Sequence, residues 1–96
     1  MGTKNNPGKF DCYAHAEPDE PMFILLGRDP VAGVVVSLWA ALRIALGETS
    51  PEKIAEAKAC AIAMTTFAVE RGKVAAVDKA NQTLKRLTGM RQGPLG

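Results

Sequence analysis

Residues 49–72 carry the strongest structural signal in the chain and read TSPEKIAEAKACAIAMTTFAVERG. The segment opens with Thr49 and Ser50, whose hydroxyl groups can cap a helix. Pro51 follows them and suits the first turn of that helix. Glu52 follows Thr49 at the spacing of a capping box, and Gly72 suits the end of the same helix. No side chain over residues 59–69 is charged. The pattern predicts a long helix with an uncharged second half.

Residues 29–46, before this segment, predict a second helix. Asp29 is a suitable N-cap, Pro30 suits the first turn, and Gly47 suits the end. Three consecutive valines lower the helix propensity and leave a strand over residues 34–38 as the alternative. We favour a helix, because apolar residues recur at helical spacing and the segment is too long for a single strand.

A shorter third helix is predicted over residues 73–88, where apolar residues recur on one side and basic residues on the other. Together with the helical hairpin over residues 29–72 it makes the chain mostly helical. Residues 1–9 and 89–96 are rich in glycine, asparagine and proline, so we expect a frayed terminus and a loose tail.

The N-terminal part of the chain suggests strands. Apolar and polar residues alternate from Phe10 to Ala16, and residues 22–26 form a short apolar run. Between them, residues 17–21 hold two prolines and three carboxylates, which favour a turn. We therefore predict an α+β fold in which a two-stranded β-hairpin over residues 10–27 packs on the two long helices.

The size and composition of the chain limit the classes of protein to consider. With 96 residues, 47% of them hydrophobic and 23% charged, we expect one small globular domain over residues 1–96. No apolar run is long enough to span a bilayer or resembles a secretory signal, so we expect no membrane partner and a cytoplasmic location. Cys12 and Cys60 are then expected to be thiols.

The two long helices predict self-association. Both carry apolar or small residues on nearly every side, and a chain of this size has little material to cover them. We expect a two-fold dimer, the commonest closed assembly. The alternative is a compact monomer with the first long helix at its centre. The residues expected at or near the dimer interface are Trp39, Leu42, Met64 and Phe67.

Candidate catalytic and metal-binding groups are few. Cys12 and His15 supply only half of the ligands of a structural zinc site, and on a strand their odd separation would point them to opposite faces. The chain holds no phosphate-binding loop and no nucleophile motif. We expect a protein that is not an enzyme and needs no cofactor, although chemistry within residues 12–20 is a remote alternative.

Binding of nucleic acid is the main alternative function. The net charge is only +2, but basic residues gather in the last quarter of the chain. There, Lys79, Lys85 and Arg86 could contact phosphates from the third predicted helix. No aromatic residue after Phe67 could stack on bases, so a solvated helix face is the favoured interpretation.

A sequence pattern over about residues 9–70 resembles small uncharacterised proteins of tailed bacteriophages and prophages. Its parts are DEPMFILL at residues 19–26, RDP at residues 28–30, then Ala32 and the pair Trp39-Ala40. This chain has Gly33 and Ser37 where those proteins often carry a proline and a basic residue. The resemblance implies no known activity. It suggests a non-catalytic accessory protein of a phage or prophage that works in the bacterial host cell through contacts with a phage or host protein.

Overall fold

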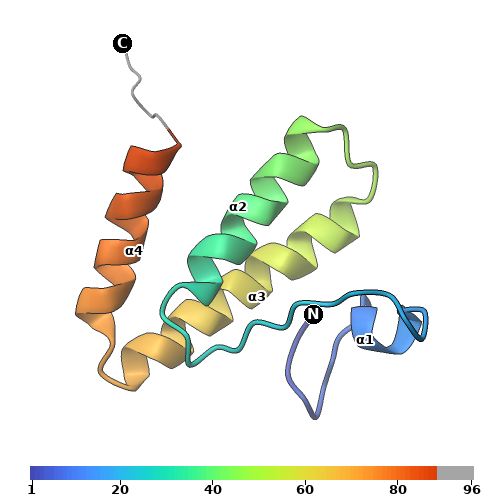
Figure 1. The fold of residues 1–96 in the computed structure, drawn as a ribbon, viewed down its shortest axis with the longest axis horizontal. Coiled ribbons are helices and arrows are strands. Elements are labelled where there is room, and N and C mark those ends of the chain that lie inside the picture. Colours follow the sequence, from blue (N-terminus) through green and yellow to red (C-terminus); the bar gives the residue numbers. More distant parts are fainter. Residues whose placement is uncertain (89–96) are drawn as a thin grey trace.

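The computed structural model describes residues 1–88 and consists of helices joined by loops (Figure 1). Two long helices, α2 (Ala32–Ala45) and α3 (Pro51–Glu70), lie side by side as an antiparallel pair. A third, α4 (Val74–Leu87), contacts both of them. It diverges from α2 along its length, so the two helices form a V in Figure 1. A single turn, α1 (Cys12–His15), lies in the N-terminal part.

The α+β prediction is wrong, because residues 1–88 contain no strand. Where the first strand of the β-hairpin was expected, the carboxylate of Asp11 accepts a hydrogen bond from the Ala14 backbone N–H at 3.5 Å and caps α1. The alternation in this segment depends on alanines, which are weak strand formers. Residues 21–26, the expected second strand, lie outside any helix and have no partner strand. The described part of the chain is therefore all-helical.

Small residues make the contact between α2 and α3. A Cβ carbon at Gly33 would lie 2.8 Å from the carbonyl oxygen of Ala61 and would also collide with Thr65 Oγ1. Glycine at position 33 therefore lets the two helix backbones approach closely. No large side chain among the described residues is fully buried. The buried apolar residues are mostly small: Ala32, Val34, Ala40, Ile54, Ala57, Ala61, Ala68 and Val77.

The ends of the helices follow from local sequence. Ser50 is the N-cap of α3, and its hydroxyl accepts a hydrogen bond from the Lys53 backbone N–H at 3.2 Å. Gly47 and Gly72 follow α2 and α3 with φ of 87° and 81°, a left-handed conformation that glycine adopts without strain. Residues 34–38 are helical, so the alternative strand does not form. The predicted tail over residues 89–96 lies outside the described residues.

The carboxylate of Glu56 joins the N-terminal segment to α3. Its two oxygens accept hydrogen bonds from the backbone N–H groups of Lys9 at 2.8 Å and Phe10 at 3.0 Å, and the amino group of Met1 lies 3.1 Å away. The hydrogen bond from Lys9 is the main reason why the pKa of Glu56 is lowered. Lys9 also reaches Glu52, which raises the pKa of the Lys9 ammonium. The backbone N–H groups of Lys9 and Phe10 are therefore bonded to the Glu56 carboxylate and not to a neighbouring strand.

Candidate interaction surfaces

Four apolar residues form a row along the solvent side of α2, and we call them the α2 stripe: Val35, Trp39, Leu42 and Leu46. Their exposed fractions are 40%, 38%, 53% and 80%. Their spacing of four, three and four residues is the heptad spacing that keeps side chains on one side of a helix. Gly33 and Ala40, which are buried, project from the opposite side. The α2 stripe therefore faces away from α3.

Helix α4 diverges from α2 (Figure 1), and the four residues of the α2 stripe stay exposed in the described structure. At the start of α2, the three consecutive residues Ala32 to Val34 are all buried, so the helix is covered on several sides there. Farther along α2, only Ala40 is buried. At the other end, Arg43 lies beside the stripe with its guanidinium 6.0 Å from the Trp39 ring centre. Arg43 also pairs with Glu48 at 2.9 Å, a hydrogen bond that lowers the pKa of the Glu48 carboxyl. Arg43, which lies beside the stripe, is thus paired with a carboxylate.

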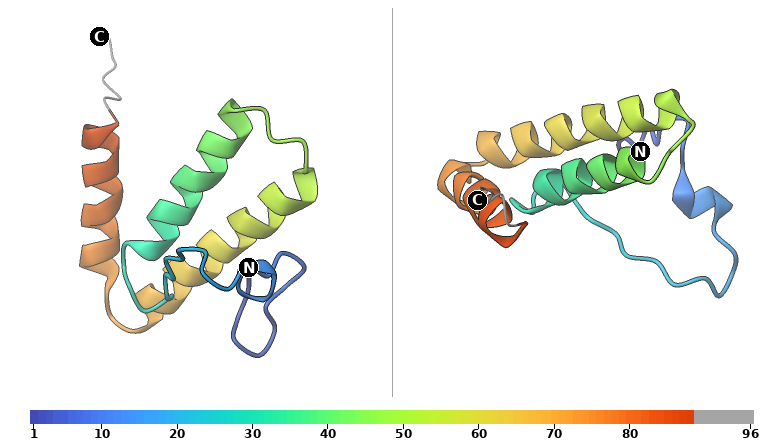
Figure 2. Two further views of the ribbon diagram at one scale, coloured as in Figure 1. Left: turned by 45° about the vertical axis from the view of Figure 1, so that its right-hand side comes forward. Right: turned by 90° about the horizontal axis from the view of Figure 1, so that it is seen from above.

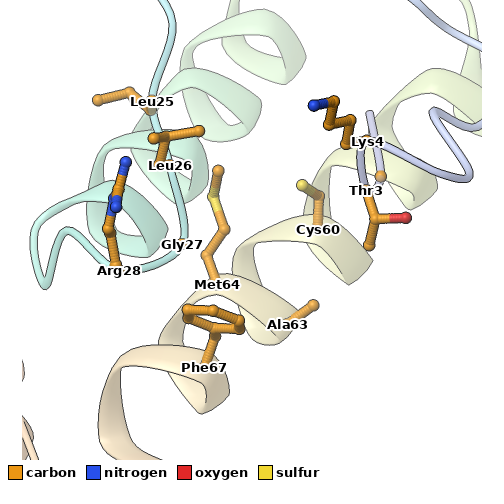
Figure 3. A pocket seen from close by; sticks show the side chains of 11 residues that line it. Thr3, Lys4, Leu25, Leu26, Gly27, Arg28, Cys60, Ala63, Met64 and Phe67 are labelled. Atoms are coloured by element: carbon orange, nitrogen blue, oxygen red, sulfur yellow. The ribbon is translucent and has the colours of Figure 1, made fainter. Parts of the chain in front are cut away.

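A second apolar surface is a groove of about 450 Å³ beside α3, which we call the α3 groove (Figure 3). Met64 and Phe67 project from α3, and Leu25 and Leu26 line the side opposite them. The guanidinium of Arg71 lies 3.3 Å from the centre of the Phe67 ring. The other residues that line the groove are Gly2, Thr3, Lys4, Gly27, Arg28, Cys60 and Ala63.

The structure divides the four residues predicted for one interface between these two surfaces. Trp39 and Leu42 lie together on the α2 stripe, whereas Met64 and Phe67 lie in the α3 groove. The groove contains no residue of α2. The four side chains therefore belong to two different surfaces of one copy.

A third surface, which the sequence did not predict as such, is the segment of residues 21–26. It runs outside the layer of helices, as the view from above in Figure 2 shows. Phe23 and Ile24 are 87% and 62% exposed. The sequence signal for this segment is its β-prone apolar run, which predicts one strand of a hairpin within the chain.

The basic residues of α4 are exposed but do not form one patch. Lys79 and Arg86 are seven residues apart and share one side of the helix. Lys85 lies about 100° around the helix from Arg86, on the side of Asp78. The described part of α4 carries no aromatic residue. Nothing in this arrangement favours nucleic acid as a partner.

Cys12 and His15 lie closer than the sequence suggested. Because α1 is a helical turn, residues three apart share a side, and the expected placement on opposite strand faces is wrong. Both side chains, with Glu20, line a shallow pocket of about 340 Å³. Nδ1 of His15 lies 2.8 Å from the backbone carbonyl oxygen of Asp11. Over residues 1–88, no group of three or more His, Cys, Asp or Glu side chains is placed to hold a metal ion.

No protein-family model matches the chain, and comparison with curated proteins and with solved structures gives no match. The resemblance to phage and prophage proteins, and with it a phage or host protein as partner, stays a prediction from the residues alone. Within the described residues, no helix combines the length and the apolar character needed to cross a membrane.

Proposed function

We propose that the protein is a non-catalytic interaction protein that associates with a second copy of itself through the α2 stripe. The observation that carries this proposal is the heptad row of exposed apolar side chains on the face of α2 that points away from α3. Such a row is the surface with which helices pack in pairs. Contiguous exposed apolar residues of this kind mark contact surfaces.

The size of the core supports the same proposal. The described chain buries mainly alanines, while Trp39, Leu42 and Leu46 stay substantially in water. Large apolar side chains contribute most of the stabilisation that burial provides, ~1.5–3 kcal/mol for each Leu or Val that is fully buried. Covering the α2 stripe would therefore give this small fold the large buried side chains that one copy lacks.

The free energy of burying the α2 stripe also limits the affinity between two copies. Each residue of the α2 stripe is already partly covered, so its further burial contributes roughly 1 kcal/mol, and four residues from each of two copies contribute on the order of 8 kcal/mol before the cost of association. We therefore expect a reversible assembly whose extent depends on protein concentration.

Sedimentation velocity over a series of protein concentrations tests the proposal. The proposal predicts that the average mass rises with concentration and that an acidic residue at Leu42 reduces it. A protein that stays monomeric at all concentrations would rule out this function.

A further inference from the structure

The α3 groove combines apolar walls with positive charge. Met64 and Phe67 form the wall on α3, and Leu25 and Leu26 line the side opposite them (Figure 3). Of the eleven residues that line the groove, two are cationic, and no acidic side chain of residues 1–88 lines it. The groove therefore offers apolar surface and positive charge in one place.

Lys4 brings one positive charge to the groove from the N-terminal segment. The Thr3 backbone N–H donates to the Asn6 carbonyl oxygen at 2.8 Å, and the Asn6 N–H donates back to the Thr3 carbonyl oxygen at 3.1 Å, so Lys4 lies in a closed turn. The carboxylate of Glu56 holds the same segment on α3. In Figure 3, the Lys4 ammonium points toward the side of the groove that Leu26 lines. It makes no ion pair within residues 1–88.

Arg28 brings a second positive charge, from the side of the groove opposite Lys4 (Figure 3). It lies in the turn that the Asp29 N–H closes by donating to the Leu26 carbonyl oxygen at 3.0 Å. The carbonyl oxygen of Arg28 also accepts a hydrogen bond from Lys73 Nζ at 2.6 Å. Its guanidinium makes no ion pair in the described part of the chain. Both cations thus belong to hydrogen-bonded turns, and neither has an acidic partner there.

We propose that the α3 groove binds a long-chain carboxylate, such as a fatty acid anion. The alkyl chain lies against Met64 and Phe67, and the carboxylate pairs with Lys4 and Arg28, which supply the charged donors that carboxylates bind most strongly. Small-molecule sites are mainly apolar concavities of ~300–1,000 Å³ with a few polar groups that fix the orientation of the ligand. The groove, at about 450 Å³, is of this size. The site is separate from the α2 stripe and goes beyond the proposed function.

The lining of the groove selects this ligand over others. A protein partner covers about 20–30 residues on each side of an interface, more than the eleven that line the groove. A nucleic acid backbone or an inorganic anion would pair with the cations but leave the apolar walls in water. A cationic amphiphile would cover the walls but meet like charges. An alkyl chain with an anionic head group uses both features of the groove.

Titration calorimetry of the full chain with decanoate tests the proposal, with two matched probes. Decyltrimethylammonium has the same alkyl chain and the opposite charge, and acetate has the carboxylate without the chain. We expect decanoate to bind one site per chain, decyltrimethylammonium to bind roughly tenfold more weakly or less, and acetate to give no binding. No binding of decanoate, or equal binding of the two decyl compounds, would overturn the proposal.

The two cysteines report where decanoate binds. Cys60 lines the groove and is half-buried, whereas Cys12 is exposed and lies outside it. We expect decanoate to slow the alkylation of Cys60 by iodoacetamide several-fold and to leave the rate at Cys12 unchanged, as measured by peptide mass spectrometry. A Cys60 rate that decanoate does not change would show that the ligand binds elsewhere and would overturn the site.

Charge reversal tests the role of the cations. We expect Lys4→Glu and Arg28→Glu each to raise the Kd for decanoate roughly fivefold, because a negative charge then faces the carboxylate. The control is Lys58→Glu, since Lys58 is exposed and lies nine residues before Phe67, on the opposite side of α3. It should bind decanoate with the Kd of wild type. The same Kd in all three variants would overturn the pairing of the carboxylate with Lys4 and Arg28.

Discussion

The backbone of Gly33 on α2 lies so close to α3 that a Cβ carbon at position 33 would stand 2.8 Å from the Ala61 carbonyl oxygen. The obstacle is backbone, so a small side-chain movement cannot remove it. Because Gly33 faces α3, the α2 stripe on the opposite side of the helix points away from α3.

We predict that Gly33→Ala lowers the free energy of unfolding by about 1–3 kcal/mol, the usual cost of overpacking a tight contact. Urea unfolding followed by circular dichroism measures the change. Ser37→Ala, an exposed substitution on the same helix, is the control and should stay within about 0.5 kcal/mol of wild type. A more stable Gly33→Ala protein would mean that helix propensity outweighs the contact with Ala61.

The cap of α3 gives a second prediction. Ser50→Ala removes the hydroxyl that accepts the Lys53 N–H and should cost about 1 kcal/mol of stability. Thr49→Ala changes the neighbouring hydroxyl, which is exposed and is not the cap, and should cost much less. Thermal unfolding of the two variants compares them directly. The reverse order of stabilities would place the cap at Thr49, as the capping-box spacing to Glu52 first suggested.

Acid should release the N-terminal segment from α3. Folding lowers the pKa of Glu56, so its hydrogen bonds stabilise the protein above the ordinary pKa of a glutamate and are lost as the pH falls through the lowered value. Exchange of the Lys9 and Phe10 amides, measured by NMR against pH, should therefore show protection at neutral pH that disappears in acid, after correction for the intrinsic exchange rate.

The Glu56→Gln variant should show weak protection of these two amides already at neutral pH. A glutamine presents one acceptor oxygen and one donor group where the carboxylate presented two acceptors. Glu52→Gln is the matched control, since among residues 1–88 Glu52 bonds only to the Lys9 side chain. Equal loss of amide protection in both variants would show that Glu56 has no special role.

The single tryptophan reports on the α2 stripe. Trp39 is 38% exposed in one copy, and association through the stripe would remove it further from water. We predict that its fluorescence emission shifts to shorter wavelength as protein concentration rises, and that Leu42→Asp suppresses the shift. An emission maximum independent of concentration would contradict burial of Trp39 on association.

The sequence predicted the three long helices better than it predicted the N-terminal segment before them. Helix α3 begins at Pro51, directly after the hydroxyl residues that the sequence offers as caps, and Gly72 follows its end. These signals are local, and a few neighbouring residues are sufficient to produce them. Over residues 10–16, by contrast, the strand pattern depended on alanines, and the capping carboxylate of Asp11 favoured a helical turn instead.

The division of the interface residues depended on contacts that are distant in sequence. Whether Met64 and Phe67 share a surface with Trp39 is decided by how α3 is rotated against α2, and by where the N-terminal segment lies. The first is set by the contact of Gly33 with Ala61, and the second by the carboxylate of Glu56, which is 46 residues from Phe10. No periodicity within one helix contains this information.

The most direct measurement is the mass of the protein in solution, by light scattering, for wild type, Leu42→Asp and Ile62→Asp at equal concentrations. Ile62 is the matched control, because it is an exposed apolar residue (69%) outside both the α2 stripe and the α3 groove. The account predicts that Leu42→Asp lowers the mass whereas Ile62→Asp retains that of wild type. Equal masses for all three proteins would show that the α2 stripe does not join copies of this chain.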